Sequence, residues 1–207
     1  MKIILIGSDG RMGREIQNLV NEEKIDKIVA LVDENKPLPK KNVKADCIID
    51  FSSAKDRTNY FEYSKKYQIP YACFSTNLSE QDEKGLLDLK YFVPTLKCQN
   101  ASDGVKLLYD LTQSCAKTLK NSQALITEVH HKNKKDSPSG TAKQLENILK
   151  ENNIPFTTTC HRVGTEKGYH KIEFYLDDEL ITISHRAFSR KIFAKGALEK
   201  AHTLITQ

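Results

Sequence analysis

Short apolar runs alternate with helical periodicity along the first hundred residues. An apolar run such as KIILIG, at residues 2–7, is typical of a buried strand, and the next segment spaces its apolar side chains as an amphipathic helix does. The strands expected here cover residues 2–7, 28–33, 45–52 and 69–75, with a fifth beginning in 91–95. One expected helix carries Met12, Ile16, Leu19 and Val20, and two more cover residues 56–67 and 80–89. Strands that alternate with helices predict an α/β fold with a Rossmann-type parallel sheet and right-handed crossovers.

The pattern changes near Asn100, where longer strands and a hairpin replace the short apolar runs. Residues 172–184 alternate in polarity in two arms, which indicates a hairpin that turns near Asp177 and Asp178. The other elements expected in this half are helices at 103–119 and 141–151, strands at 123–131 and 157–164, and a final helix at 196–205. This half therefore predicts an α+β domain with an open mixed sheet, and the final helix is expected to pack back on the first half.

Composition indicates a soluble globular protein. The 207 residues are 39% hydrophobic and 29% charged, and no run approaches the roughly 18 apolar residues of a membrane span. The N-terminal apolar run breaks at Gly7, too early for a signal peptide, so we expect a cytoplasmic protein. The net charge of +5 is interleaved along the chain, which argues against nucleic-acid binding and is compatible with an anionic small molecule.

The cysteines predict neither a zinc site nor a disulfide framework. There are five of them, widely spaced and without a Cys-x-x-Cys pair. We expect them to be small core residues in a reducing compartment.

A glycine-rich loop follows the first expected strand. In GSDGRMG, Gly7, Gly10 and Gly13 allow a tight turn and let backbone N–H groups approach a pyrophosphate at the start of a helix. The spacing is Gly-x-x-Gly-x-x-Gly rather than the commoner Gly-x-Gly-x-x-Gly. A plain turn between strand and helix is the alternative interpretation.

An acidic residue at the end of the second expected strand supports the dinucleotide interpretation. Asp33 lies 20 residues beyond Gly13, where a carboxylate hydrogen-bonds the adenosine ribose. Asp33 and Glu34 together would repel a 2′-phosphate, which favours NADH over NADPH, although Lys36 and Arg11 oppose this preference. The alternative is a solvated loop carboxylate.

The stretch EVHHKNKKDSPSGTA, residues 128–142, combines proton carriers with an anion-binding helix start. His130 and His131 end a strand, and histidine exchanges protons near neutral pH. Ser139 fits a helix N-cap, after which the N–H groups of Gly140 and Thr141 could bind a carboxylate. Together these residues predict a general acid beside an anion site.

Two other interpretations of this stretch are weaker. Single histidines are usually structural, and lysine clusters such as Lys132, Lys134 and Lys135 usually belong to solvated loops. A metal site is disfavoured because adjacent histidines on a strand point in opposite directions and no carboxylate or cysteine completes a ligand set at the usual spacing. We therefore expect no metal.

The stretch at residues 128–142 closely resembles the signature of the 4-hydroxy-tetrahydrodipicolinate reductase family, also called dihydrodipicolinate reductase. GSDGRMG resembles the family's Gly-x-x-Gly-Arg-Met-Gly loop. Further matches run in order along the chain: Asn100-x-Ser102-x-Gly104-Val105, Arg162-x-Gly164, Gly168-x-His170 and Phe193-Ala194-x-Gly196-Ala197. The resemblance implies an enzyme of lysine and diaminopimelate biosynthesis that uses NADH or NADPH to reduce a cyclic unsaturated dicarboxylate to tetrahydrodipicolinate.

The resemblance also implies roles for residues of the second half. His130 would donate the proton, and Lys134 would assist this step and bind a substrate carboxylate. His131 would contact the substrate, while Gly140 and Thr141 would hold the other carboxylate through their N–H groups. The cofactor-binding residues implied are Gly7, Gly10, Arg11, Met12, Gly13, Asp33, Ser75, Thr76 and Asn100.

The resemblance assigns roles to the domains as well. Residues 1–99 would form the dinucleotide-binding domain, joined by the C-terminal segment 190–207. Residues 100–189 would bind substrate and, through their sheet, build a homotetramer. The reaction needs a positioned acid, because hydride addition to a conjugated C=C–C=N system leaves an enamine-like anion.

This chain departs from the family pattern in three places. Phe74-Ser75-Thr76-Asn77 stands where the family often has Gly-Thr-Thr-Gly, and the loops after Asp33 and between Gly164 and Gly168 are short. Two alternative functions are another Rossmann-type oxidoreductase acting on an amino-acid-like substrate, and a non-catalytic NAD(H)-binding sensor.

Overall fold

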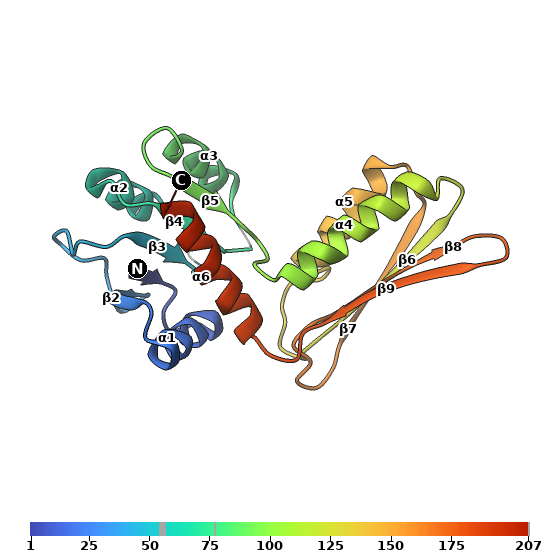
Figure 1. Cartoon of the computed structure of the whole chain (residues 1–207), viewed down its shortest axis with the longest axis horizontal. Coiled ribbons are helices and arrows are strands. Elements are labelled where there is room, and N and C mark those ends of the chain that lie inside the picture. The colour runs from blue at the N-terminus through green and yellow to red at the C-terminus, as the bar shows by residue number, and fades with distance from the viewer. Residues whose placement is uncertain (54–56, 77, 207) are drawn as a thin grey trace. The chain divides into compact units, whose positions relative to one another are not determined.

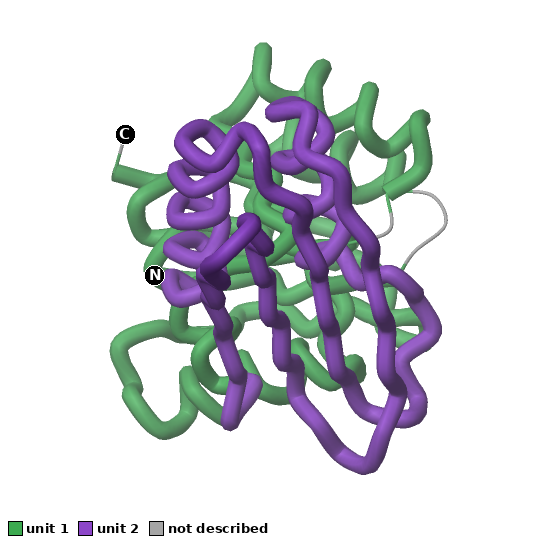
Figure 2. Tube along the Cα trace, turned by 90° about the vertical axis from the view of Figure 1, so that its right-hand side faces the viewer, with its two compact units in different colours: residues 1–101, 191–207 green, residues 102–190 purple. Residues whose placement is uncertain are grey.

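The structure is a computed structural model that describes residues 1–53, 57–76 and 78–206. Asp56, at the expected start of a helix, and Asn77 lie outside the described residues, as does Gln207 at the end of the C-terminal segment. The chain forms two compact units, one of residues 1–101 with 191–207 and the other of residues 102–190 (Figure 2). The expected fold class is confirmed: the first unit carries a parallel sheet and the second a mixed sheet.

The first unit is built on five parallel strands in the order β2-β1-β3-β4-β5 (Figure 1). The strands are β1 (Lys2–Ile6), β2 (Lys27–Val32), β3 (Cys47–Asp50), β4 (Tyr71–Cys73) and β5 (Thr95–Lys97). The helices are α1 (Arg11–Glu23), α2 (Thr58–Tyr67), α3 (Glu80–Leu89) and α6 (Lys191–Ile205).

Residues of β1 feed two separate cores because successive side chains on a strand point to opposite faces. Ile3 and Leu5 pack with the buried side chains of α1 and α6. Ile4 and Ile6 pack with those of α2 and α3. Both faces are therefore covered, which explains why β1 is apolar throughout rather than alternating.

Two expected boundaries in this unit were wrong. β5 begins after Pro94 rather than at Tyr91, because the N–H groups of residues 91–93 continue the end of α3 by bonding to the carbonyls of Asp88 and Leu89. The last helix begins at Lys191 rather than Gly196. Gly196 lies inside it, and only glycine fits there because a Cβ would come within 2.1 Å of the carbonyl oxygen of Ala101.

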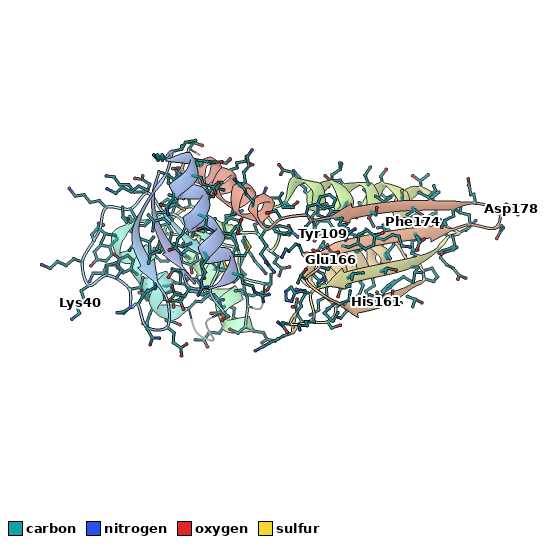
Figure 3. All side chains as sticks on the ribbon, turned by 90° about the horizontal axis from the view of Figure 1, so that it is seen from below. Lys40, Tyr109, His161, Glu166, Phe174 and Asp178 are labelled. Atoms are coloured by element: carbon teal, nitrogen blue, oxygen red, sulfur yellow. The ribbon has the colours of Figure 1, made fainter. Side chains whose placement is uncertain are left out.

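The second unit carries a four-stranded mixed sheet in the order β7-β6-β8-β9. The strands are β6 (Gln123–His130), β7 (Phe156–Arg162), β8 (Tyr169–Tyr175) and β9 (Leu180–Arg186). β6 pairs with β7 in parallel and with β8 in antiparallel fashion. The hairpin between β8 and β9 turns where expected, with Asp178 at its tip (Figure 3).

Two helices of this unit, α4 (Asp103–Thr118) and α5 (Gly140–Glu151), cover one face of its sheet. Ile126, Ile172 and Phe174 are fully buried beneath them. The opposite face is only partly buried and includes Tyr175 and Leu180, which face each other across the hairpin. All five cysteines are free; Cys47 and Cys73 are buried as core residues, whereas Cys98, Cys115 and Cys160 are only partly buried. Among the described residues, no helix combines the length and apolar character that a membrane crossing requires.

Candidate active site

The glycine loop lies between β1 and α1 in a conformation that requires glycine. Gly7 has φ +78°, and a Cβ there would lie 2.6 Å from the backbone nitrogen of Ser52. A Cβ at Gly13 would lie 2.1 Å from the carbonyl oxygen of Gly7. Gly10 is the N-cap of α1, so Arg11 and Met12 open the helix and their N–H groups begin its first turn.

Two buried hydroxyls, one in this loop and one after β3, could donate hydrogen bonds to oxygen atoms of a ligand. Ser8 Oγ and Ser52 Oγ have no hydrogen-bond partner in the part of the chain that the structure describes. A buried hydroxyl without a partner is costly, so binding of a group that accepts a hydrogen bond from it would be favoured. The loop, the helix N-terminus and these hydroxyls together suit a dinucleotide pyrophosphate.

Asp33 is joined to the glycine loop. Its Oδ2 accepts a hydrogen bond from the N–H of Asp9 at 2.8 Å, and its Oδ1 accepts one from the N–H of Glu34 at 2.9 Å. The Nζ of Lys36 lies 2.5 Å from Asp9 Oδ1, in an ion pair that leaves both side chains partly exposed. Asp33 therefore stands at the carboxyl end of β2 beside the loop, where a ribose would be recognised.

The other expected cofactor residues follow β4 and β5 at the same edge of the sheet. Ser75 is buried, and its hydroxyl donates to the carbonyl oxygen of Ser52 at 2.8 Å. Thr76 is exposed and Asn100 is half-buried. The carboxyl ends of parallel strands are where ligands bind in sheets of this kind.

A buried ion network that sequence reasoning missed fixes the segments after β3 and β4. The guanidinium of Arg57, fully buried, bonds to Asp50 at 3.0 Å and to Asp82 at 2.9 Å. It also donates to the carbonyl oxygen of Ser52 at 2.9 Å, and Tyr71 donates to Asp50 at 2.7 Å. The one sequence feature that could have suggested this network is the carboxylate of Asp50 at the end of an otherwise apolar strand.

In the second unit, His130 lies at the end of β6 within a cluster of polar side chains beneath the helices. Glu128 and His130 are two residues apart on the strand, so both point to the helix-covered face. Across the antiparallel pairing, His170 of β8 stands directly opposite Glu128. The rings of His130 and His170 meet edge to face, with centroids 5.0 Å apart.

Glu128 is at the centre of this cluster and is fully buried. Its Oε1 lies 2.7 Å from a guanidinium nitrogen of Arg162, and both of its oxygens lie 3.2 Å from the N–H of Ser139. Burial tends to raise the pKa of Glu128, but its hydrogen bonds, which involve His170, Ser139 and Arg162, lower it well below its usual range. The carboxylate is therefore ionised at neutral pH.

His130 is neutral in the ligand-free protein. Burial, together with the nearby His170 and Lys134, lowers the pKa of His130 to about 3, although Glu128 opposes this shift. The residue is only 7% exposed. A ligand that brings negative charge would raise this pKa again.

The loop after β6 carries the expected lysine. Lys134 Nζ lies 2.8 and 2.9 Å from the two carboxylate oxygens of Asp136, and both side chains are partly buried. Burial acts to raise the pKa of Asp136, but the hydrogen bond and charge of Lys134 lower it. His131 follows the strand directly and is half-buried, whereas Lys132 and Lys135 are exposed.

The start of α5 has the geometry of an anion site. Ser139 is its N-cap, as expected, and its Oγ accepts the N–H of Ala142 at 3.2 Å. Gly140 opens the helix, one residue earlier than expected, and Thr141 follows. A Cβ at Gly140 would meet no atom within 4 Å among the described residues, so there is space beside this helix end. First-turn N–H groups have no partner within their own helix, which suits a carboxylate.

A metal-like grouping in this cluster was not foreseen. Glu128, His130 and His170 each place one ligand atom within 4.8 Å of the others. The sequence argument against a ligand set considered neighbours along the chain, and this set forms across two strands. Arg162 already bonds to Glu128, and its positive charge opposes the binding of a cation there.

Glu128, Arg162 and His170 received no role from the sequence. The alternation along β6 pairs Glu128 with His130 on one face and could have identified it. The other two required the register of β7 and β8, in which Arg162 stands opposite His130 and His170 opposite Glu128.

Comparison with known proteins finds one family along nearly the whole chain. Residues 1–101 match the model described as dihydrodipicolinate reductase, N-terminus, and residues 104–207 match the one described as dihydrodipicolinate reductase, C-terminus. Among similar curated proteins, the 4-hydroxy-tetrahydrodipicolinate reductase of Caldanaerobacter subterraneus subsp. tengcongensis is 32% identical, covering 100% of this chain and 94% of the relative. That of Thermosipho africanus is 33% identical, covering 100% and 93%.

Solved structures support the fold. A dipicolinate-bound dihydrodipicolinate reductase from Paenisporosarcina sp. TG-14 superposes with a TM-score of 0.77 at 17% identity, covering 100% of this chain and 95% of that one. An aspartate dehydrogenase from Thermotoga maritima reaches a TM-score of 0.55 at 11% identity, covering 99% and 96%.

The pKa of His130 predicts how stability depends on pH. Between pH 6.5 and about 3 the unfolded chain binds a proton at this residue that the folded chain does not, so stability falls as the pH falls through this window. In the variant His130→Gln this contribution is absent. We expect its melting temperature to drop less than that of the wild type between neutral pH and about pH 5.

Thermal unfolding followed by circular dichroism measures this difference. His161→Gln, which changes an exposed histidine of the same unit, is the control and should follow the wild type. Equal pH dependence in all three proteins would contradict burial of a neutral His130.

Proposed function

The chain belongs to the dihydrodipicolinate reductase family, and from this we propose that it reduces 4-hydroxy-tetrahydrodipicolinate to tetrahydrodipicolinate in diaminopimelate and lysine biosynthesis. It is a pyridine-nucleotide-dependent oxidoreductase. The observation that carries this proposal is the buried His130 and Glu128 pair beside the N-terminus of α5. When bound, the nicotinamide cofactor supplies the hydride. The neighbouring residues of the chain handle the proton and the carboxylates.

In our proposal His130 donates the proton that completes the reduction. Lys134 assists this step and binds one substrate carboxylate, and His131 contacts the substrate. The first-turn N–H groups of Gly140 and Thr141 bind the other carboxylate. The support is that a strand end, a cationic loop and a helix N-terminus lie together in one unit.

The substrate itself supplies the charge that makes His130 an acid. A neutral imidazole cannot donate a proton to carbon, and the free protein keeps His130 neutral. Two substrate carboxylates beside it place negative charge where burial and Lys134 had disfavoured the imidazolium, and this raises the pKa. Dipicolinate, a planar dicarboxylate, should do the same without being reduced.

The first unit is the proposed dinucleotide-binding domain and the second the proposed substrate-binding domain. Contacts suited to the cofactor are the backbone at Gly7, Gly10 and Gly13, the start of α1 at Arg11 and Met12, and the side chains of Asp33, Ser75, Thr76 and Asn100. We prefer NADH as the cofactor because Asp33 and Asp9 place two carboxylates where a 2′-phosphate would lie, and Lys36 neutralises only one of them.

We also propose a cytoplasmic homotetramer. The partly exposed face of the sheet in the second unit, with Tyr175 and Leu180, is the surface that further copies would cover. No nucleic acid or membrane has a part in this function.

Activity is tested by a coupled assay with pyruvate, aspartate semialdehyde and the condensing synthase, in which NADH absorbance is followed. The wild type should oxidise NADH well above background. His130→Gln should retain cofactor binding, measured by calorimetry, and lose roughly 10²–10⁴-fold in kcat, the usual effect of losing a general acid.

The matched control for this assay is Lys135→Ala, an exposed lysine of the same loop, which should keep its kcat. No NADH oxidation by the wild type would exclude the reductase and leave the two alternatives, another oxidoreductase acting on an amino-acid-like substrate or an NAD(H)-binding sensor. Normal kcat in His130→Gln would remove this residue from the acid role.

Cofactor preference depends on the charge at Asp33. Asp33→Asn keeps an oxygen to accept the N–H of Asp9 but removes the charge, so the ratio of kcat/KM for NADH to that for NADPH should fall about tenfold, equivalent to about 1.4 kcal/mol. Asp46→Asn is the control, because Asp46 bonds to the N–H of Lys2 at the opposite edge of the sheet. A wild type that prefers NADPH would refute the charge argument.

Assembly is measured by analytical ultracentrifugation. The wild type should sediment as four chains of 23.5 kDa. The double variant Tyr175→Asp, Leu180→Asp places charges on the partly exposed face and should shift the protein toward smaller species. A wild type that remains a single chain at micromolar concentration would rule the tetramer out.

A further inference from the structure

The two ring nitrogens of His130 have different surroundings. Nδ1 is buried, lies 3.6 Å from Glu128 Oε2, and has no hydrogen-bond partner within the described ranges. Nε2 faces the backbone of Gly168, where a Cβ would come within 3.3 Å of it. Gly168 has φ +155°, a conformation that L side chains rarely adopt, so the space beside Nε2 stays clear. Nε2 therefore faces a residue without a side chain, whereas Nδ1 faces the carboxylate of Glu128.

Glu128 is held so that Oε2 is directed at the imidazoles. Arg162 bonds to Oε1 at 2.7 Å and is itself fixed by donating to the carbonyl oxygen of Asp136 at 2.6 Å. The N–H of Ser139 approaches both carboxylate oxygens at 3.2 Å. These contacts keep the carboxylate charged and prevent it from rotating away from β8 and the end of β6.

His170 is the other imidazole near the same oxygen. Its Nε2 lies 3.6 Å from Oε2 of Glu128 but only 3.1 Å from Ser139 Oγ, which is within hydrogen-bond distance. Its shorter contact is therefore with the N-cap of α5, while its interaction with Glu128 helps to lower the pKa of that carboxyl. Glu128 Oε2 also lies 3.6 Å from His130 Nδ1, which has no other hydrogen-bond partner among the described residues.

Given the proposed reductase function, we propose that Glu128 is the positioning residue of His130. It accepts a hydrogen bond from Nδ1–H and so directs the reacting proton to Nε2, on the side of Gly168. The separation of 3.6 Å is longer than a hydrogen bond, and such contacts commonly shorten in the working complex. A buried carboxylate that orients an imidazole in this way is a recurrent arrangement in general acid–base catalysis.

The proton step balances with these groups alone. The Nε2–H bond of the imidazolium breaks, and a C–H bond forms at the substrate carbon from the electron pair of the enamine. The N–H electron pair stays on Nε2, which leaves a neutral imidazole with its proton on Nδ1. Glu128 remains ionised throughout and Arg162 continues to balance its charge.

The wild-type protein gives the first test, without any turnover. Long-range ¹H–¹⁵N NMR of histidine-labelled protein reports which ring nitrogen carries the proton, and His130→Gln identifies the signals of His130 by their loss. We expect the proton of neutral His130 to be on Nδ1 near neutral pH. A proton on Nε2 would overturn the proposal.

The second test removes the charge of Glu128 but keeps its shape. In Glu128→Gln we expect the Nε2–H tautomer to gain population and kcat to fall roughly 10²–10⁴-fold, the scale of a misplaced tautomer, while KM changes much less. Glu146→Gln is the control: Glu146 accepts a hydrogen bond from Thr158 at 2.8 Å in the same unit, and its variant should keep both the tautomer and kcat. If Glu128→Gln keeps the wild-type tautomer and kcat, Glu128 does not position His130.

These results separate the positioning role from the proposed function. A wild type without reductase activity that still carries the Nδ1 proton would refute the function and leave the pairing intact. An active wild type with the proton on Nε2 would refute only the positioning role. If Glu128→Gln does not fold, the wild-type spectrum still decides.

Discussion

The buried carboxylate of Glu128 is the constraint on which the second unit depends. An ionised group with no solvent exposure must be compensated by the protein, and here a guanidinium and a backbone N–H compensate it. Removing one partner of such a buried pair costs about 3–5 kcal/mol. The compensation ties three elements together, because Arg162 ends β7, Ser139 begins α5, and Glu128 lies on β6. The same contacts that stabilise the charge therefore hold the helix N-terminus and the strand end beside each other.

That arrangement also suits the acid role that we propose for His130, despite its low pKa in the free protein. His130 is kept neutral by burial and by the cations that would attract a dicarboxylate. In the proposed function, the substrate carboxylates would neutralise the charge of Lys134, one of the groups that disfavour the imidazolium in the free protein. A site built in this way holds its proton only when the substrate is present.

The sequence predicted the fold well because each element carries its own local signal. Short, continuous apolar runs were enough to predict β1 to β4, and Gly7 and Gly13 were enough to predict the loop before α1. The errors came from residues whose conformation depends on contacts far along the chain. Gly196 was expected to begin the last helix, yet it lies within it, where the absence of a side chain lets it pack against Ala101. In the proposed site, the stretch from Glu128 to Ala142 was singled out from the sequence, whereas the placement of Arg162 and His170 beside it depends on strand register that no local pattern specifies.

Proton uptake on ligand binding tests the central claim most directly. Calorimetric titration with dipicolinate near neutral pH, in buffers of different ionisation enthalpy, counts the protons taken up per chain. We predict uptake of about one proton by the wild type and little by His130→Gln. The reason is that binding raises the pKa of His130 from below the pH of the measurement to above it. Binding without proton uptake by the wild type would contradict the claim that the dicarboxylate charges this histidine.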